Sequence, residues 1–249
     1  MNVANKLVNV CNKINNAKIH CNEMLVTKGV SEASTLWEVG DKIGEIVLGD
    51  GGATKEALID LIECDITELN IPNGTTSIGY AAFAYREQMT KVIIPNSVET
   101  IDVLGFSYCE ALSSITIPRT VVNIMDYAFD SCNALSSIVF EENSSLTTLG
   151  TNAFSGCTAL SSITIPIGIS QIGSGTFLRC SNLNSLILPR TEMISLNSTN
   201  AFSYTPIASG TGYIYVPQTL LSEYQSATNW STYSSQFRAI EDYPDIVGG

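Results

Sequence analysis

The stretch Leu112-Ser-Ser-Ile-Thr-Ile-Pro118 decides the fold, because close variants of it recur along the chain. The clearest copies are Leu160-Ser-Ser-Ile-Thr-Ile-Pro166 and Leu183-Asn-Ser-Leu-Ile-Leu-Pro189. A phenylalanine follows each copy and marks a period of 23 to 25 residues, at Phe83, Phe106, Phe129, Phe154, Phe177 and Phe202. A fixed period of this length is typical of solenoids, in which every repeat forms one coil of a stack.

One repeat can be followed from Leu112 to Cys132. Ile115 and Ile117 alternate with small polar residues, which predicts a short strand with one apolar face. Pro118 is expected to end the strand, because proline has no amide N–H for a sheet ladder. Ala128-Phe129 then predicts a short helical or 3₁₀ segment whose aromatic ring fills the coil interior. A single repeat has no second face to bury these side chains against, so the repeats must stack.

A cysteine stands three residues after the phenylalanine in four repeats, at Cys109, Cys132, Cys157 and Cys180. Equivalent side chains of adjacent coils lie about 5 Å apart, which would permit disulfides. We expect a row of buried free thiols instead, because free cysteine behaves as a small hydrophobe. The end repeats carry Arg86 and Thr205 at this position, as expected where a stack meets a cap.

The complete pattern, Leu-x-x-Ile-x-Ile-Pro-x-x-Val-x-x-Ile-Gly-x-x-Ala-Phe-x-x-Cys, resembles the BspA-like (Treponema pallidum type) leucine-rich repeats. The resemblance covers six tandem copies, from Ile66 to Pro217. That family includes bacterial and protist surface proteins that bind host matrix or other cells, and it also occurs in phage-encoded proteins. It has no shared catalytic residues. The resemblance therefore implies a binding or structural protein and no enzyme.

Residues 1–28 predict a helix whose apolar residues recur at alternating spacings of four and three, as in a coiled coil. Its net charge of +3, on a chain with a net charge of −12, suits an acidic partner. There are two alternatives for this helix. It can associate with copies of itself, by analogy with fibre proteins as a homotrimer, or it can dock on the acidic remainder of its own chain. The predicted oligomerisation seam consists of Val3, Leu7, Val10, Ile14, Ala17, Cys21 and Met24.

The repeat array is expected to be flanked by helical segments. Gly49-Asp50-Gly51-Gly52 is the best linker candidate, and residues after Val216-Pro217 lose the repeat pattern. We therefore expect a mainly β fold with short helices, in which a leucine-rich-repeat solenoid of about six coils spans residues 53–217. Residues 1–50 would form a helical N-terminal segment and residues 218–249 a helical cap. Phe202, in the last coil, would have a stacking neighbour on one side only.

Composition excludes some classes of function. The chain has 24 acidic against 12 basic residues, so no basic stripe is available to bind nucleic acid. No run of 18 apolar residues occurs, so no membrane insertion is expected. The segment Met1–Lys6 begins no apolar signal-peptide core, so either the N-terminus was trimmed or the protein does not use the secretory route.

No pattern in the sequence predicts catalysis, a cofactor or a metal. His20, the only histidine, falls on the predicted coiled-coil helix, and the recurring serine pairs lack an adjacent base. Glu141-Glu142 and the pair Asp126 and Asp130 have no neighbour that would separate their pKa values for acid–base work. Cys-x-x-Cys pairs, which would predict a structural zinc site, are absent from the sequence.

The outward-facing strand positions form the candidate ligand-binding face, because they alternate with buried positions along successive strands. A flat face of small hydroxyl residues suits protein or glycan contacts, although it is also what plain exposed strands would show. The Lys28–Val30 joint, with the short helix and Gly-rich break after it, looks like the N-terminal segments of tail-associated proteins of gut-bacterial phages. The run from Tyr215 to Ile240 is similar to the closing segment of such arrays in phage and gut-bacterial proteins. Because a virion component needs no signal peptide whereas a secreted adhesin needs export, we favour a virion tail or fibre component. The alternative is a bacterial or protist surface adhesin. The predicted ligand-binding residues are Glu68, Asn70, Lys91, Ile93, Ser114, Thr116, Ser137, Val139, Ser162, Thr164, Ser185 and Ile187.

Overall fold

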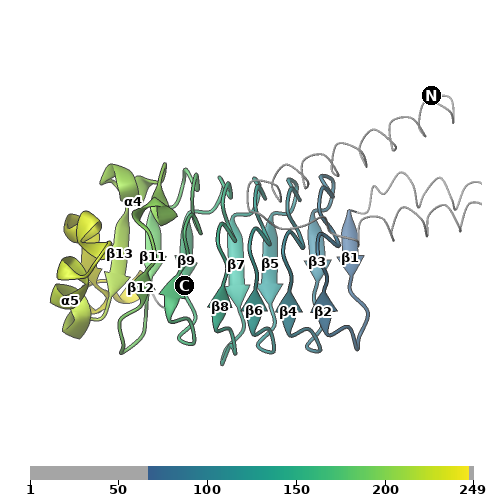
Figure 1. The fold of residues 1–249 in the computed structure, drawn as a ribbon, viewed down its shortest axis with the longest axis horizontal. Coiled ribbons are helices and arrows are strands. Elements are labelled where there is room, and N and C mark those ends of the chain that lie inside the picture. Colours follow the sequence, from purple (N-terminus) through teal and green to yellow (C-terminus); the bar gives the residue numbers. More distant parts are fainter. Residues whose placement is uncertain (1–66, 247–249) are drawn as a thin grey trace, which may run out of the picture. The chain divides into compact units, whose positions relative to one another are not determined.

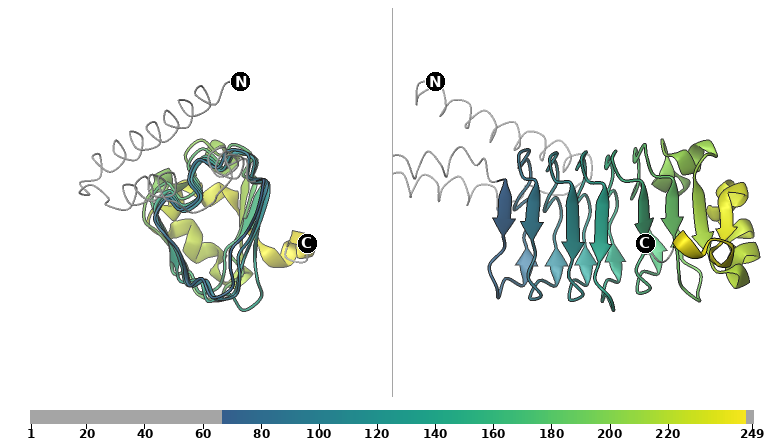
Figure 2. Two further views of the ribbon diagram at one scale, coloured as in Figure 1. Left: turned by 90° about the vertical axis from the view of Figure 1, so that its right-hand side faces the viewer. Right: turned by 180° about the vertical axis from the view of Figure 1, so that it is seen from behind.

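The computed structural model describes residues 67–246, which form a single stack of coils closed at its C-terminal end (Figure 1). Viewed along the stack, each coil has three sides, and the coils superimpose closely (Figure 2). The predicted N-terminal helix, its oligomerisation seam and His20 lie outside the described residues. Every strand pairing within residues 67–246 is parallel, as stacking of equivalent segments requires.

The first side of the stack, here called the strand wall, holds the longest strands. Those of the repeats come from the Leu-x-x-Ile-x-Ile segments, and a proline follows most of them, as predicted for Pro118; β7 is followed by Glu141 instead. Hydrogen bonds join them into the groups β1–β3, β5–β7 and β9–β11–β13–β14, which stand beside one another along the wall. The strands are β1 (Glu68–Asn70), β3 (Lys91–Ile93), β5 (Ser114–Ile117), β7 (Ser137–Phe140), β9 (Ser162–Thr164), β11 (Ser185–Ile187), β13 (Tyr213–Val216) and β14 (Phe237–Ala239).

A second wall is made of two-residue strands, one from each coil. In each of them the second residue is buried and the first points outward, as the period of two requires. These strands are β2 (Ser77–Ile78), β4 (Thr100–Ile101), β6 (Asn123–Ile124), β8 (Thr148–Leu149), β10 (Gln171–Ile172) and β12 (Ser195–Leu196).

The third side consists of turns, and here the expectation of a helical segment at each phenylalanine is wrong for the first five coils. Residues two before and two after the phenylalanine have positive φ, for example Tyr127 (57°) and Ser131 (58°) around Phe129. A helix cannot contain such left-handed residues. The amide of Phe129 instead donates to Ala153 of the next coil at 2.8 Å, so this side is a hydrogen-bonded ladder between coils. Only the last coil has a 3₁₀ helix, η1 (Thr199–Phe202).

The interior contains a continuous column of phenylalanine rings. From Phe83 to Phe202 each ring stacks on the next, with centroids 5.3 to 6.0 Å apart. Such offset stacking is favourable beyond the burial of the rings alone. The five rings from Phe106 to Phe202 are fully buried. Repetition of one residue in sequence thus becomes one column in space.

The four repeat cysteines are free and buried, as predicted. Each thiol donates to the carbonyl of the phenylalanine in the preceding coil, at 3.1 to 3.3 Å. Burial raises the pKa of Cys109 and Cys180 from about 9.0 to about 12, and it also raises the pKa of Cys132 and Cys157. The cysteines therefore act as small buried donors that tie one coil to the next.

The C-terminal residues close the stack with short helices and one strand. A four-residue helix precedes β13, and Thr205 caps it by accepting from the Ala208 amide at 3.2 Å. Strand β14 then pairs with β13 and extends the strand wall, which the sequence had not predicted. The helices are α4 (Pro206–Ser209), η2 (Gln218–Leu220), α5 (Leu221–Ser226), η3 (Trp230–Gln236), η4 (Ile240–Asp242) and η5 (Pro244–Ile246).

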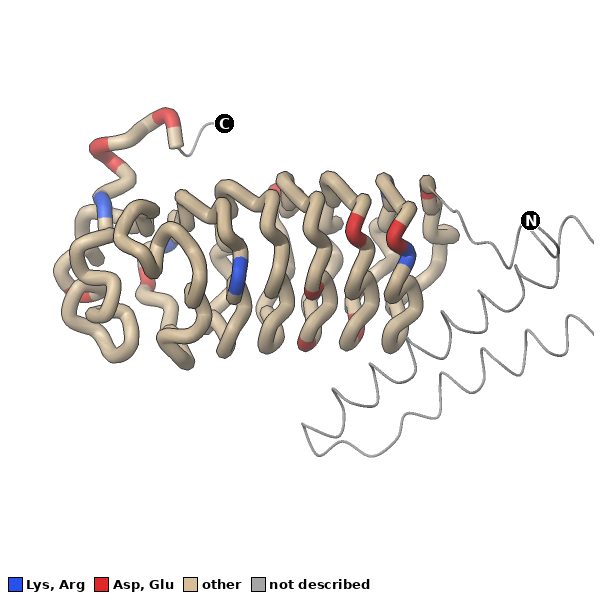
Figure 3. Tube along the Cα trace, turned by 90° about the horizontal axis from the view of Figure 1, so that it is seen from above, with Lys and Arg blue, Asp and Glu red and all other residues tan. Residues whose placement is uncertain are grey.

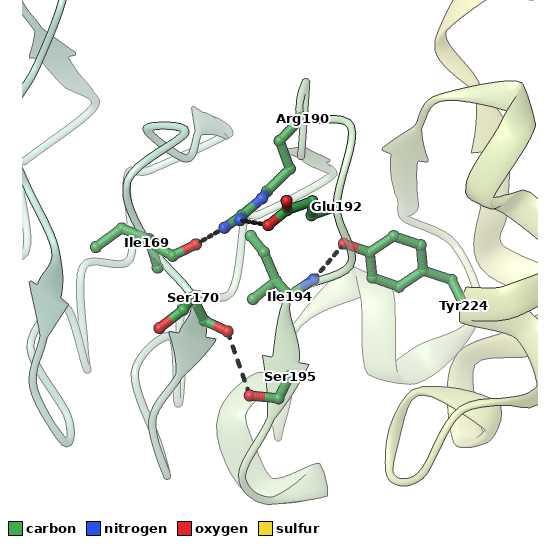
Figure 4. A network of polar contacts seen from close by, with 7 residues as sticks. All are labelled: Ile169, Ser170, Arg190, Glu192, Ile194, Ser195 and Tyr224. Carbon is green, nitrogen blue, oxygen red and sulfur yellow. Dashed lines mark hydrogen bonds and ion pairs between the residues drawn. The ribbon is translucent and has the colours of Figure 1, made fainter.

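Side chains of the cap satisfy backbone groups at the open edge of the second wall. The Tyr224 hydroxyl accepts from the Ile194 amide at 2.8 Å (Figure 4), and the Trp230 indole donates to the Ile194 carbonyl at 2.7 Å. Asn229 donates to the Leu196 carbonyl at 2.7 Å. Unpaired edge groups would otherwise be a template for aggregation.

The cap also corrects the expectation for Phe202. Its ring lies between Phe177 on one side and the rings of Trp230 and Tyr233 on the other, with centroids 5.9 and 5.4 Å from the Phe202 centroid. Phe202 is fully buried. The last coil therefore has neighbours on both sides, because the cap supplies aromatic rings where another repeat would supply phenylalanine.

An arginine side chain connects the coil that carries two extra residues before β12 to the preceding coil. Arg190 donates through Nη1 to the Ile169 carbonyl of the preceding coil, and its Nη2 lies 3.5 Å from the Glu192 carboxylate (Figure 4). In a regular coil the equivalent carbonyl, that of Val98, accepts from the Thr120 hydroxyl at 2.9 Å. The long side chain thus replaces a threonine where the insertion moves the backbone away.

Candidate functional site

The outer face of the strand wall carries two parallel rows of side chains. The sheet register places Ser114 opposite Ser137 and Thr116 opposite Val139, and then Ser162 opposite Ser185. Because neighbouring strands lie about 4.8 Å apart, the rows run along the stack as closely spaced ladders. The structure therefore brings the predicted ligand-binding residues together on one face.

Ten of the twelve predicted residues are exposed there, from Glu68 on β1 to Thr164 on β9. The exceptions are both on β11: Ser185 is half-buried, and Ile187 is only 3% exposed. At equivalent positions Ile93 and Val139 are 50% and 51% exposed. Ile187 is therefore not an accessible surface residue.

The two serines of the pair Ser136-Ser137 have different roles. Ser136 donates from its hydroxyl to the Ser113 carbonyl of the preceding coil at 3.1 Å, and the Thr90 hydroxyl donates to the Thr67 carbonyl at 2.9 Å. These first-position hydroxyls hold neighbouring coils together. The second serine of the pair, such as Ser137, belongs to the outward row and is left for contacts with solvent or a ligand.

Charge is almost absent from the middle of this face, and charged residues are sparse along the coils generally (Figure 3). Strands β5, β7, β9, β11 and β13 contain no charged residue. At the N-terminal end Lys91 and Glu68 form an exposed ion pair at 3.7 Å, of a kind that contributes less than about 1 kcal/mol. The face is thus an uncharged strip of serine, threonine and branched apolar side chains.

An aromatic cluster that the sequence had not predicted ends this strip. Tyr213 and Tyr215 continue the two outward rows onto β13, and their rings meet edge to face at 6.4 Å. The guanidinium of Arg238 on β14 lies 4.3 Å from the centre of the Tyr213 ring. A signal was available, because the alternation in Tyr213-Ile-Tyr-Val216 matches that of the earlier strands.

The segment after β14 folds over this end of the strand wall. In the view along the stack it lies outside the coils (Figure 2). Tyr243 packs edge-on against Tyr215 at 5.4 Å, and Tyr215 retains 6% exposure. Burial raises the pKa of Tyr215, while a hydrogen bond with Ser185 and the charge of Arg238 act to lower it. Ile187 is covered because Tyr215 stands beside it on β13 and because this segment folds over the same end of the wall.

The acidic pairs considered for catalysis bind backbone amides. Glu141 accepts from the Arg119 amide at 3.0 Å, and Asp126 accepts from the Thr151 amide at 2.7 Å. Within residues 67–246, no three His, Cys, Asp or Glu side chains are close enough to hold a metal ion. In the same part of the chain, no helix is long and apolar enough to cross a bilayer.

Parallel strands, one short coil per repeat and a shared hydrophobic column define a leucine-rich-repeat solenoid. The model of the BspA type leucine-rich-repeat region matches residues 61–145 and 105–227, in six copies. The chain belongs to this family.

Three solved structures of leucine-rich proteins are similar to this chain. A leucine-rich repeat protein from Bacteroides ovatus is 31% identical (TM-score 0.49) over 61% of this chain and 37% of its own length. The T. pallidum leucine-rich repeat protein is 27% identical (TM-score 0.47) over 53% of this chain and 69% of its own. A leucine-rich cell surface protein from Faecalibacterium prausnitzii is 22% identical (TM-score 0.30) over 68% and 62%. This chain thus spans little more than a third of the Bacteroides ovatus protein. Among curated proteins, no sequence matches it.

Proposed function

We propose that the chain is a non-enzymatic attachment protein whose strand wall binds a protein or glycan on a cell surface. The observation that carries the proposal is the uncharged, exposed outer face of β5, β7 and β9, where no structural partner occupies the second-row hydroxyls of Thr116 and Thr164 in the described chain. Side chains such as the Ser136 hydroxyl, which hold the fold together, point elsewhere. The outward side chains can therefore bind a ligand without breaking the contacts that hold the coils together.

The proposed context is a phage virion, as a tail or fibre component that attaches to a gut-bacterial host. Similarity of the Lys28–Val30 joint to the N-terminal segments of phage tail-associated proteins supports this, while the closing segment resembles those of both phage and gut-bacterial proteins. A surface adhesin of a bacterium or protist is the second candidate, supported by membership of a family that contains such proteins. Sequencing of the neighbouring genes separates them: adjacent capsid and tail genes support the virion, whereas an adjacent sorting or secretion system supports the adhesin.

The strand face is tested by replacing Ser114, Ser137 and Ser162 together with arginine. Long charged side chains on three adjacent coils would block contact with a partner while leaving the interior unchanged. We expect binding of the labelled protein to candidate host cells to fall to background with an unaltered melting curve. The matched control places arginine at Ser77, Thr148 and Gln171, which face outward on the second wall. Equal cell binding by both triple variants would show that the strand face is not the site.

We also propose that the seam from Val3 to Met24 joins copies of the chain into a trimer or anchors it to other virion proteins. Three heptads are about the minimum length at which a marginal helix is stabilised by partners. Light scattering on the full chain and on a chain that starts at Gly52 tests this. A monomeric mass for both at micromolar concentration would remove self-association from the proposal.

A further inference from the structure

The cluster of Tyr213, Tyr215, Arg238 and Tyr243 has properties that the rest of the strand wall lacks. We propose that it is a subsite for an acidic sugar, with Arg238 binding the sugar's carboxylate and Tyr243 packing against its ring. The proposal rests on the proposed binding role of the strand wall, and it names the ligand class and the end of the wall where recognition takes place.

Arg238 is held in place before any ligand arrives. Its Nη1 donates to the carbonyls of Ser235 and Phe237 at 2.9 and 2.7 Å, and its guanidinium lies against the Tyr213 ring. The N–H groups on Nε and Nη2 make no hydrogen bond with described residues, and neither atom is among the buried unsatisfied ones. A planar donor edge therefore faces solvent in a fixed orientation.

No carboxylate in the described part of the chain forms an ion pair with Arg238, whereas Lys91, the other cation on the strands of this wall, is paired with Glu68. The nearest acid in sequence, Glu241, accepts from the Gln218 amide at 2.9 Å and so serves the cap. A guanidinium fork matches the two oxygens of a carboxylate, and charge assistance makes such pairs strong. Arg238 is thus complementary to one anionic group.

The surroundings of Arg238 favour a sugar over an acidic peptide. A peptide with several carboxylates would need several cations, but β5, β7, β9, β11 and β13 contain none. They offer hydroxyl groups instead, which can bond sugar hydroxyls, and the nearest exposed ones are those of Ser162 and Thr164 on β9. Tyr243 is 42% exposed and presents a rigid amphipathic ring for packing. One charge, one aromatic platform and a strip of hydroxyls together fit an acidic glycan that runs along the wall.

Saturation-transfer NMR and calorimetry with 3′-sialyllactose, trigalacturonic acid and neutral lactose test the proposal on the full chain. We expect at least one acidic sugar to bind and lactose to bind far more weakly. Arg238→Gln should lower the affinity for the acidic sugar by about tenfold or more, because hydrogen bonds between charged groups are stronger than those between neutral groups. Arg238→Lys should also lose affinity, because lysine lacks the planar fork. Tyr243→Ala, at an exposed site near the chain end, should weaken binding without altering the melting curve.

The matched control is Arg179→Gln. Arg179 also lies over a tyrosine, Tyr204 at 5.9 Å, but it is on the turn side of the stack. Its variant should bind like the wild type. Failure of both acidic sugars to bind, equal binding of lactose, or unchanged binding by Arg238→Gln would overturn the proposal. If the triple serine-to-arginine variant loses cell binding while Arg238→Gln keeps it, the attachment function stands and the acidic-sugar subsite alone is wrong.

Discussion

The coils and the cap solve one problem, the covering of an open edge, by different means. Inside the array each coil is covered by a near-copy of itself. Its phenylalanine ring therefore stacks on the phenylalanine ring of the next coil, and its cysteine thiol donates to the phenylalanine carbonyl of the preceding coil. At the C-terminal end three unlike residues do this work: Trp230 packs at a tilt against Phe202, Tyr224 accepts from the Ile194 amide, and Asn229 donates to the Leu196 carbonyl. Repetition provides complementarity automatically, whereas a cap must achieve it residue by residue.

The largest expected effect tests whether the cap stabilises the ring beside it as much as a neighbouring coil does. Phe129→Ala and Phe202→Ala should each lower the free energy of unfolding by about 3 to 5 kcal/mol, because both rings are fully buried with aromatic partners on both sides. Denaturant titrations of the two variants give the comparison. A much smaller loss at Phe202 would mean that the cap packs loosely and that the equivalence fails.

A smaller effect isolates the cap's hydrogen bonds. Trp230→Phe keeps an aromatic ring beside Phe202 but removes the indole donor, which leaves the Ile194 carbonyl without that partner. We expect a loss of about 1 to 3 kcal/mol, the cost of an unsatisfied buried group. Tyr224→Phe removes the partner of the Ile194 amide and should cost a similar amount. Because both bonds end on Ile194, the double variant is expected to depart from additivity in urea titrations.

The third prediction concerns the thiols that tie coil to coil. Burial raises the pKa of Cys109 and Cys180 from about 9.0 to about 12, so between these pH values the unfolded chain loses their protons and the folded chain keeps them. Stability from these groups is therefore complete below about pH 9 and falls by about 1.4 kcal/mol per pH unit for each thiol above it. Urea titrations at about pH 8 and pH 10 should show a shallower decline for the variant with Cys109→Ala and Cys180→Ala. An identical decline would assign the loss to other groups.

The smallest effect separates the two serines of one pair. Ser136→Ala removes a hydroxyl that donates to the Ser113 carbonyl and should cost about 0.5 to 1 kcal/mol. Ser137→Ala, one residue along on the outward row, should change stability by less than about 0.5 kcal/mol. Thermal unfolding of the two variants tests the distinction between coil-joining and outward hydroxyls. A larger loss of stability for Ser137→Ala than for Ser136→Ala would contradict this assignment of the two hydroxyls.

The repeating part of the fold could be predicted because one local pattern is repeated often enough to average out exceptions. Strand positions, the proline stops, the phenylalanine column and the buried thiols all follow from the spacing of apolar residues. The turn side could not, because left-handed residues there include tyrosine and arginine, such as Tyr108 and Arg179, which carry no sign of positive φ. Their conformation is imposed by the ladder of hydrogen bonds to the next coil.

The candidate site was predictable only where it repeats. Ser114, Ser137 and Ser162 share one position in the repeat, so alternation alone places them on one face. Arg238 and Tyr243 stand in segments without a repeat, and their position beside Tyr213 and Tyr215 depends on β14 pairing with β13. The covering of Ile187 follows from the same tertiary contacts, which no local pattern encodes.

The cap binds mostly to what every coil shares. Its hydrogen bonds at β12 and just before it reach the backbone of Leu196 and Ile194, and its indole ring packs at a tilt against the ring at the phenylalanine position. Loss or duplication of one interior coil by unequal recombination would leave the last coil, with its 3₁₀ helix η1, in place as the docking surface of the cap. The length of the protein can change in steps of one repeat while both the closing segment and the aromatic end of the strand wall are inherited unchanged. A lineage can in this way vary how far its recognition surface extends without evolving a new terminus.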